Sequence, residues 1–431
     1  MRRPFNFNVA IPFTLNLIAL TVVFCVALFW FFSKALSTGT ARFYFFCYIA
    51  CLLLIGAAFS KMRKLSYAIL VWCTIELVLG FGSRTMALHG HGTSLFPRNI
   101  GTAPDPWNTA FIYHPLLQFA PRPNWQYKDH VDFGANADNA KAAGIDVQSL
   151  QGREIDFVHN SLGLRGKELT EDDLAKSLIF VYGGSTTYDI GLTQGETWVE
   201  DLQSGFKNRY TVLNLGVPAH STVQHLIETA FYQNVVKKKP ACAVYYIGWN
   251  DIINAHVKNL DDAYADYYLL LAAQHKPAIP LAKYSPLLLF ANAMAVRRFD
   301  TLPQHPRISG QTPVAGSDPH LEAIFIDHVK TIAAINEARG IKTIFIGQIL
   351  NRNWPITPRY VPLIKDGEFV PLMERFKSLL KSAASSTPAK YIDPGVTNFA
   401  GNDFVDEGHF AASGARKFAT LVSKEIGDYC Q

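Results

Sequence analysis

The sequence feature that most restricts the fold is an alternation of short apolar runs and helical stretches that begins near residue 177. The apolar runs are continuous, which is the pattern of strands buried on both faces of a parallel sheet. They cover residues 178–182, 210–216, 241–247, 341–349 and 390–393. Stretches with helical spacing separate them and cover residues 196–207, 221–238, 321–339 and 413–426. We therefore expect an α/β domain with three layers, α/β/α, around a parallel sheet of about five strands.

Residues 251–320 interrupt this alternation and are too many for an ordinary connection. This stretch holds several prolines and tyrosines, and residues 284–296 are nearly uncharged. We interpret it as an insertion near the functional site, with three alternatives: a lid, a substrate-recognition element or a membrane-facing helix.

Three long apolar stretches occupy most of the first 86 residues, at residues 10–32, 43–59 and 65–81. Each is close to the roughly 20 residues that cross the hydrocarbon core of a bilayer. The first could instead be a signal peptide, but its length and the two stretches that follow favour a membrane span. We predict a membrane anchor of three transmembrane helices over residues 1–86, a connecting region over residues 87–158 and the α/β domain over residues 159–431.

Basic residues give the predicted anchor an orientation. Arg2 and Arg3 precede the first stretch, and basic residues at 61–64 separate the second from the third. The positive-inside rule places both on the cytoplasmic side, and three crossings place everything after Arg84 outside. We therefore expect a multi-pass protein of the cytoplasmic (inner) membrane whose α/β domain lies on the periplasmic or extracellular side. Glu76, in the third stretch, is either a functional carboxylate or one that reaches water at the outer surface.

The remaining composition predicts neither a nucleic-acid partner nor a metal site. The net charge is only +5 and no long Lys/Arg block is present, so we expect no nucleic-acid surface. The six cysteines show neither metal-ligand spacing nor a disulfide framework, and we interpret Cys242, Cys430 and the others as small buried apolar residues. His220 and His225 lie close together, but we find no third ligand at a suitable spacing.

Four short polar segments follow the predicted strands and contain the residues that could carry chemistry. They are residues 183–187, 214–216, 248–251 and 406–409. Ligand sites of parallel sheets lie at the carboxyl ends of the strands. We therefore expect these four segments to share one site.

Each segment also has a plain structural interpretation. Ser185 stands among small residues that permit a sharp, exposed turn, but glycine–serine turns are common in loops. Gly216 permits a close backbone approach or simply ends a strand. Asn250 could donate to a developing oxyanion or cap a helix. Asp406 precedes His409 by three residues, so it could orient the imidazole or belong to a surface loop.

Taken together, the four segments resemble the sequence blocks of the SGNH (GDSL-like) hydrolase family. They present a serine in a Gly-rich first block, a glycine in the second, Gly-x-Asn-Asp in the third and Asp-x-x-His near the C-terminus. The resemblance extends over residues 160–431, and residues 160–166 resemble a segment that precedes the catalytic domain in membrane-linked members. Gly184 stands where the commoner first block has aspartate, but many members resemble this chain in having Gly-Gly-Ser-Thr.

This resemblance implies a set of catalytic roles. Ser185 is implied as the nucleophile that attacks an acyl carbonyl, His409 as its base and Asp406 as the residue that orients His409. The N–H groups of Ser185 and Gly216 and the side chain of Asn250 are implied as the oxyanion hole. The resemblance implies no metal and no organic cofactor.

Four functions are compatible with these residues. The first is a membrane-anchored serine esterase acting on an O-acyl ester, foremost O-acetyl, of an extracytoplasmic glycan or glycolipid. The second is an O-acyltransferase on an exported polysaccharide, which would need a membrane partner protein to supply its acyl donor. The third is a non-catalytic glycan-binding module, against which the complete set of Ser185, Asp406, His409 and Asn250 argues. The fourth is a lipase, suggested by the apolar run at residues 287–289 and the predicted closeness of the bilayer.

Overall fold

The computed structural model describes residues 71–72, 74–75, 78, 107–206, 209–257, 260, 262, 312–355, 361 and 363–431. The chain divides into two compact units, and nearly all of these residues belong to the unit formed by Thr109–His275 and Pro303–Gln431. The first two predicted membrane spans, most of the third with Glu76, and most of the predicted insertion lie outside the described residues. Within the described ranges, no helix is both long enough and apolar enough to cross a bilayer.

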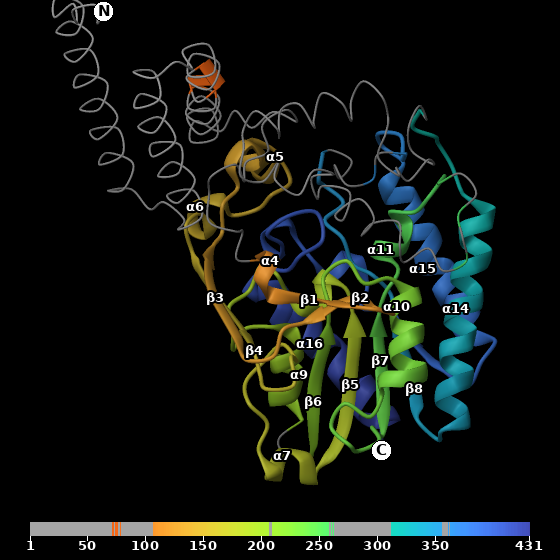
Figure 1. The fold of residues 1–431 in the computed structure, drawn as a ribbon. Coiled ribbons are helices and arrows are strands. Elements are labelled where there is room, and N and C mark those ends of the chain that lie inside the picture. The colour runs from red at the N-terminus through yellow and green to blue at the C-terminus, as the bar shows by residue number, and fades with distance from the viewer. Residues whose placement is uncertain are drawn as a thin grey trace, which may run out of the picture. The chain divides into compact units, whose positions relative to one another are not determined.

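Five parallel strands form the central sheet, in the order β6-β5-β7-β8-β9 (Figure 1). Their bounds are β5 Ser177–Gly183, β6 Tyr210–Gly216, β7 Cys242–Tyr246, β8 Lys342–Ile346 and β9 Lys390–Ile392. This arrangement confirms the predicted α/β fold with a parallel sheet. Gly183 at the end of β5 lies in register with Gly216 on β6 and Tyr246 on β7. The loops that follow these three strands therefore start from one edge of the sheet.

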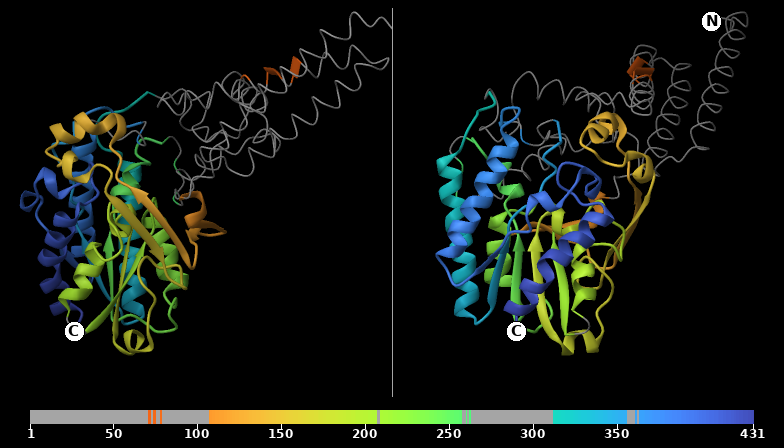
Figure 2. Two further views of the ribbon diagram at one scale, coloured as in Figure 1. Left: turned by 90° about the vertical axis from the view of Figure 1, so that its left-hand side faces the viewer. Right: turned by 180° about the vertical axis from the view of Figure 1, so that it is seen from behind.

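Helices cover both faces of this sheet, as Figure 2 shows. Their bounds are α9 Trp198–Gly205 and α16 Ala412–Tyr429 on one face, and α10 Thr222–Ile227, α14 Pro319–Ala338 and α15 Phe369–Ser385 on the other. Because side chains alternate along a strand, Phe180 and Tyr182 enter the core beside α14 and α15, while Ile179 and Val181 enter the core beside α9 and α16. All four side chains are fully buried, which explains why residues 178–182 are apolar without interruption.

Two antiparallel strand pairs precede the sheet, and all but the last residue of the second pair lie within the predicted connecting region. Strand β1 (Phe111–His114) pairs antiparallel with β2 (Gln118–Pro121), and β3 (Trp125–His130) pairs antiparallel with β4 (Glu154–His159). Between β3 and β4 lie the short helices α5 (Ala137–Ala142) and α6 (Val147–Leu150). Side chains of these helices share a hydrophobic cluster with Ala411, two residues after His409. The connecting region therefore packs against the segment that contains Ala411. The predicted boundary between the connecting region and the α/β domain, after residue 158, stays a prediction.

A disulfide bond joins Cys242, the first residue of β7, to Cys430, which follows α16. The two residues are separated by 188 positions, and their Cα atoms are 5.5 Å apart. Our interpretation of these two cysteines as unpaired apolar residues is therefore wrong. The pairing depends on where the C-terminal helix ends against the sheet, which no local spacing of cysteines reveals.

Removing this disulfide is expected to destabilise the domain by about 2–5 kcal/mol, the usual range for a native cross-link. The comparison is between urea unfolding midpoints of the full-length chain with and without dithiothreitol. The double variant Cys242→Ala/Cys430→Ala is the matched control, and reductant should not change its midpoint. A wild-type midpoint that does not respond to reductant, with two extra free thiols detected by mass, would contradict the cross-link's role.

Candidate active site

Ser185 is the first residue of the one-turn helix α8 (Ser185–Tyr188), which begins directly after β5. The two glycines before it have no room for a side chain. A Cβ atom at Gly183 would lie 2.6 Å from the carbonyl oxygen of Tyr246, and one at Gly184 would lie 2.3 Å from Nδ2 of Asn250. A side chain at position 184 would therefore displace the amide of Asn250.

Three of the predicted side chains meet beside this turn. Nε2 of His409 lies 2.8 Å from Oγ of Ser185, although the two residues are 224 positions apart. Nδ1 of His409 lies 2.6 Å from Oδ2 of Asp406. The other oxygen of Asp406 accepts hydrogen bonds of 2.8 Å from the backbone N–H groups of Gly408 and His409. The result is a continuous hydrogen-bonded chain from carboxylate to imidazole to hydroxyl.

The charges of this pair stabilise each other. Burial favours a neutral His409, but the charge of Asp406 and its hydrogen bond outweigh burial and raise the pKa of the imidazole above its usual value. Burial likewise opposes ionisation of Asp406, yet the charge and hydrogen bond of His409, with two backbone N–H groups, lower the pKa of its carboxyl. The carboxylate is thus ready to stabilise an imidazolium, as a general base requires when it takes a proton.

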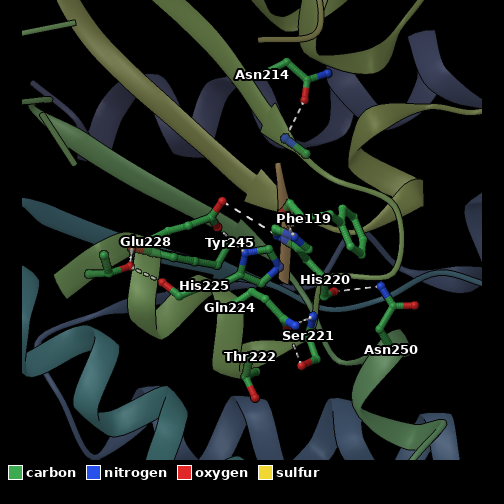
Figure 3. A network of polar contacts seen from close by, with 12 residues as sticks. Phe119, Asn214, His220, Ser221, Thr222, Gln224, His225, Glu228, Tyr245 and Asn250 are labelled. Atoms are coloured by element: carbon green, nitrogen blue, oxygen red, sulfur yellow. Dashed lines mark hydrogen bonds and ion pairs between the residues drawn. The ribbon is translucent and has the colours of Figure 1, made fainter. Parts of the chain in front are cut away.

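Asn250 lies next to Gly184, in the short helix α11 (Trp249–Ile252) that follows β7. Its Nδ2 donates a 2.7 Å hydrogen bond to the carbonyl oxygen of His220 (Figure 3). An amide nitrogen carries two hydrogens, and the second makes no hydrogen bond with the described residues. The side chain is therefore oriented by His220 and keeps one donor for a ligand next to Ser185.

The neighbouring Asp251 does not cap its own helix. Its carboxylate accepts hydrogen bonds from the backbone N–H and the hydroxyl of Thr222, at 3.1 and 2.6 Å, at the start of α10. The pair Asn250-Asp251 therefore ties the loop after β6 to the turn after β7 at two points.

Gly216 has a different role from the predicted one. Its N–H donates a 2.9 Å hydrogen bond to Oδ1 of Asn214, whose own Nδ2 donates to the carbonyl of Thr187. A Cβ atom at Gly216 would lie 2.4 Å from the backbone nitrogen of Tyr188. Gly216 therefore allows β6 to pack tightly against α8, and its N–H is already bound to a side chain.

Ala219 offers a backbone donor that the sequence does not reveal. It has φ of 69°, a left-handed conformation that is uncommon for a residue other than glycine. Its N–H makes no hydrogen bond with the described residues. Ala219 also precedes His220, whose carbonyl holds Asn250. An alanine after Pro218 carries no sequence signal for positive φ, so only the structure identifies it as a candidate oxyanion donor.

Arg165, from the segment that resembles membrane-linked members of the family, supports the loop after α8. Its buried guanidinium donates to the carbonyls of Leu192 and Tyr188 at 2.9 and 3.4 Å and to the side chain of Gln194 at 3.2 Å. It also lies 5.0 Å from the centre of the Phe157 ring. Arg165 therefore fixes the chain immediately after the nucleophile turn.

Glu228 is a further buried polar residue whose position beside two histidines no sequence motif marks. Glu228 lies three residues after His225, and its carboxylate is close to both His220 and His225. Residues at i and i+3 share a helix face, so this spacing was the available signal.

Comparisons with known proteins give only distant likenesses. No protein-family model matches this sequence, and no curated protein matches it. Similar solved structures include a GDSL-like lipase from Bacteroides thetaiotaomicron, at 14% identity, covering 60% of this chain and 92% of the lipase with a TM-score of 0.34.

Two other similar structures are esterases by name. An acetylxylan esterase from Geobacillus stearothermophilus has 11% identity, covers 58% of this chain and 94% of its own, and has a TM-score of 0.34. A carbohydrate acetylesterase from Sinorhizobium meliloti has 12% identity, covers 59% of this chain and 99% of its own, and has a TM-score of 0.33. Likenesses at this level leave the chemistry to be inferred from this chain's own side chains.

Proposed function

We propose that this chain is a serine esterase of the SGNH type. The observation that carries the proposal is the hydrogen-bonded chain from Asp406 through His409 to Ser185, with distances of 2.6 and 2.8 Å, at the edge of the sheet where the strands end. A serine hydroxyl is a weak nucleophile by itself and becomes effective when an adjacent imidazole accepts its proton.

The reaction proceeds in two halves. Oγ of Ser185 attacks the ester carbonyl while Nε2 of His409 takes its proton, and Asp406 stabilises the resulting imidazolium. The backbone N–H of Ser185 and Nδ2 of Asn250 bind the developing oxyanion, with the N–H of Ala219 as a third donor. His409 then protonates the leaving alcohol, an acyl-enzyme remains, and water activated by His409 releases the carboxylic acid.

The proposal extends to where the enzyme acts. Three apolar stretches with a basic cytoplasmic flank support a membrane-anchored protein with its α/β domain outside the cytoplasmic membrane. The disulfide between Cys242 and Cys430 also supports an extracytoplasmic site, because disulfides persist in oxidising compartments. Exported glycans and glycolipids can carry O-acyl esters at that surface, so an O-acetyl group on such a polymer is the proposed substrate.

A substrate panel tests this assignment with the purified full-length chain. We expect release of acetate from p-nitrophenyl acetate and from O-acetylated oligosaccharides, with p-nitrophenyl octanoate hydrolysed more slowly. Adding unacetylated oligosaccharide should leave the rate unchanged. Preference for the octanoyl ester would indicate a lipase, whereas acetyl transfer to added sugar in place of water would indicate an acyltransferase.

Replacing Asn250 is expected to weaken the reaction without unfolding the domain. Losing one oxyanion donor costs on the order of 10²–10³-fold in kcat, so Asn250→Ala should lower kcat by that factor and change KM little. Asn250→Asp is the matched variant, since it keeps the shape but replaces the donor nitrogen with an acceptor oxygen. Steady-state kinetics on p-nitrophenyl acetate, with melting temperatures for both variants, check this. An Asn250→Ala enzyme with more than half of wild-type kcat would rule out the donor role.

A further inference from the structure

A second cluster of polar side chains lies at the loop after β6, in which the carbonyl of His220 accepts the hydrogen bond from Asn250. It consists of His220, His225 and Glu228, which come from the loop after β6, from α10 and from the π-helical turn Glu228–Tyr232 that continues α10. The exposed fractions of the three residues are only 1%, 0% and 8%. Each offers one metal-ligating atom, and these atoms all lie within 4.8 Å of one another. Figure 3 shows the two imidazole rings next to the carboxylate.

The hydrogen bonds of His220 leave one of its nitrogens facing the carboxylate. Nε2 lies 3.2 Å from the carbonyl oxygen of Phe119, which can only accept, so Nε2 carries the hydrogen. In a neutral imidazole, Nδ1 then has a lone pair and no hydrogen. Nδ1 lies 3.7 Å from Oε1 of Glu228, too far for a hydrogen bond, and it has no hydrogen-bond partner among the described residues. Two electron-rich atoms thus face each other in a buried place.

His225 brings a third donor atom to the same place. Its Nδ1 donates a 3.0 Å hydrogen bond to Oε2 of Glu228, so a metal ion would displace that hydrogen, and its Nε2 has no hydrogen-bond partner among the described residues. Burying a carboxylate is costly unless cations or donors compensate its charge. Here the surroundings supply imidazole nitrogens and aromatic rings, including Tyr182 with its ring centre 6.3 Å from that of His225.

We propose that His220, His225 and Glu228 bind a divalent transition-metal ion of the Zn²⁺ class. Two imidazoles and one carboxylate are a donor set that such ions prefer. Bonds of about 2.0–2.1 Å in a tetrahedral site place neighbouring ligand atoms about 3.3 Å apart. Nδ1 of His225 lies 3.0 Å from Oε2 of Glu228, and Nδ1 of His220 lies 3.7 Å from Oε1. These two separations lie on either side of the tetrahedral value.

The surroundings of His220 have the form expected for a metal ligand. A ligating histidine usually donates its second ring N–H to a backbone carbonyl or a carboxylate, which fixes the tautomer, and Phe119 supplies that carbonyl. All three ligands are buried, so the ion would act through the loop that carries His220. Through the His220 carbonyl, the ion would hold the loop that orients Asn250.

Metal binding is measured directly, without an activity assay. The purified full-length chain is stripped with a chelator, titrated with Zn²⁺ by calorimetry, and its bound metal is counted by elemental mass spectrometry after desalting. Wild type should bind one Zn²⁺ per chain and gain melting temperature on binding. Glu228→Gln and His225→Gln should weaken binding by at least about 10–100-fold. His328→Gln, which changes another buried histidine outside the cluster, is the matched control and should bind as wild type does.

X-ray absorption of the Zn²⁺-loaded wild type gives a reading that does not depend on the folding of any variant. The expected first shell contains imidazole nitrogens and oxygen, without sulfur. Failure of wild type to bind one equivalent of Zn²⁺ would overturn the proposal and leave a buried polar cluster held by the hydrogen bond between His225 and Glu228. Equal binding by wild type and Glu228→Gln, or a sulfur ligand in the absorption spectrum, would also overturn it.

Discussion

Ser185→Ala is expected to lower kcat for p-nitrophenyl acetate by about 10⁴–10⁶-fold, the loss seen when the nucleophile of such an arrangement is removed. The hydroxyl is the atom that forms the bond to the acyl carbon, and no neighbouring side chain replaces it. Its described side-chain hydrogen bond is with Nε2 of His409, so the substitution should leave the melting temperature almost unchanged. The measurement is initial rate at saturating ester with the full-length protein.

A second serine serves as the control for this result. Ser413 lies on the exposed side of α16 and donates to the carbonyl of Asn402, away from the hydrogen-bonded chain. Ser413→Ala should keep wild-type kcat. If Ser185→Ala retained a tenth of the wild-type rate, another residue would have to be the nucleophile and the proposed mechanism would be wrong.

Asp406→Asn is expected to lower kcat by about 10⁴-fold, because an amide holds the imidazole in the wrong tautomer and cannot stabilise its charged form. The substitution also changes the pH dependence. In wild type, Asp406 raises the pKa of His409 above its usual value, and the base must be neutral to accept the serine proton. The rise of kcat/KM with pH should therefore be centred above the usual histidine pKa.

The charge of Asp406 also determines in which direction the pKa of His409 shifts in Asp406→Asn. Without the carboxylate, burial dominates, the pKa of His409 falls, and the midpoint of the pH limb should move to lower pH. The measurement is kcat/KM from about pH 5 to 9 at one ionic strength, for wild type and for Asp406→Asn. The midpoints of the two pH profiles are then compared. An unchanged midpoint in the variant would mean that Asp406 does not control the charge of His409.

The sheet could be predicted because burial on both faces leaves a simple pattern. Residues 178–182 are apolar without interruption since β5 sits between two strands and under helices on both sides. Helix α15 was not predicted, although Leu372, Phe376 and Leu380 have helical spacing and Pro371 in its first turn is compatible with a helix start. The strand pairs β1–β2 and β3–β4 were missed because they are short and mostly half-exposed, so they carry no continuous apolar run.

The candidate site could be predicted where position along the chain dictates geometry. Ser185 follows β5, and Asp406 and His409 lie in the segment between β9 and α16 that meets it. The backbone donors were harder to predict, since the N–H of Gly216 is bound by Asn214 and the free N–H belongs to Ala219. Backbone hydrogen bonding and left-handed conformations depend on tertiary contacts that residue types do not encode.

The most direct test of the proposed nucleophile is covalent labelling. The full-length protein is treated with a fluorophosphonate, which phosphonylates activated serines, and the digested peptides are mapped by mass spectrometry. The account predicts one label per chain, on Ser185, with labelling lost in Ser185→Ala and strongly slowed in Asp406→Asn. A wild-type protein that stays unlabelled, or one labelled equally at another residue in both variants, would contradict the central claim that Asp406 and His409 activate Ser185.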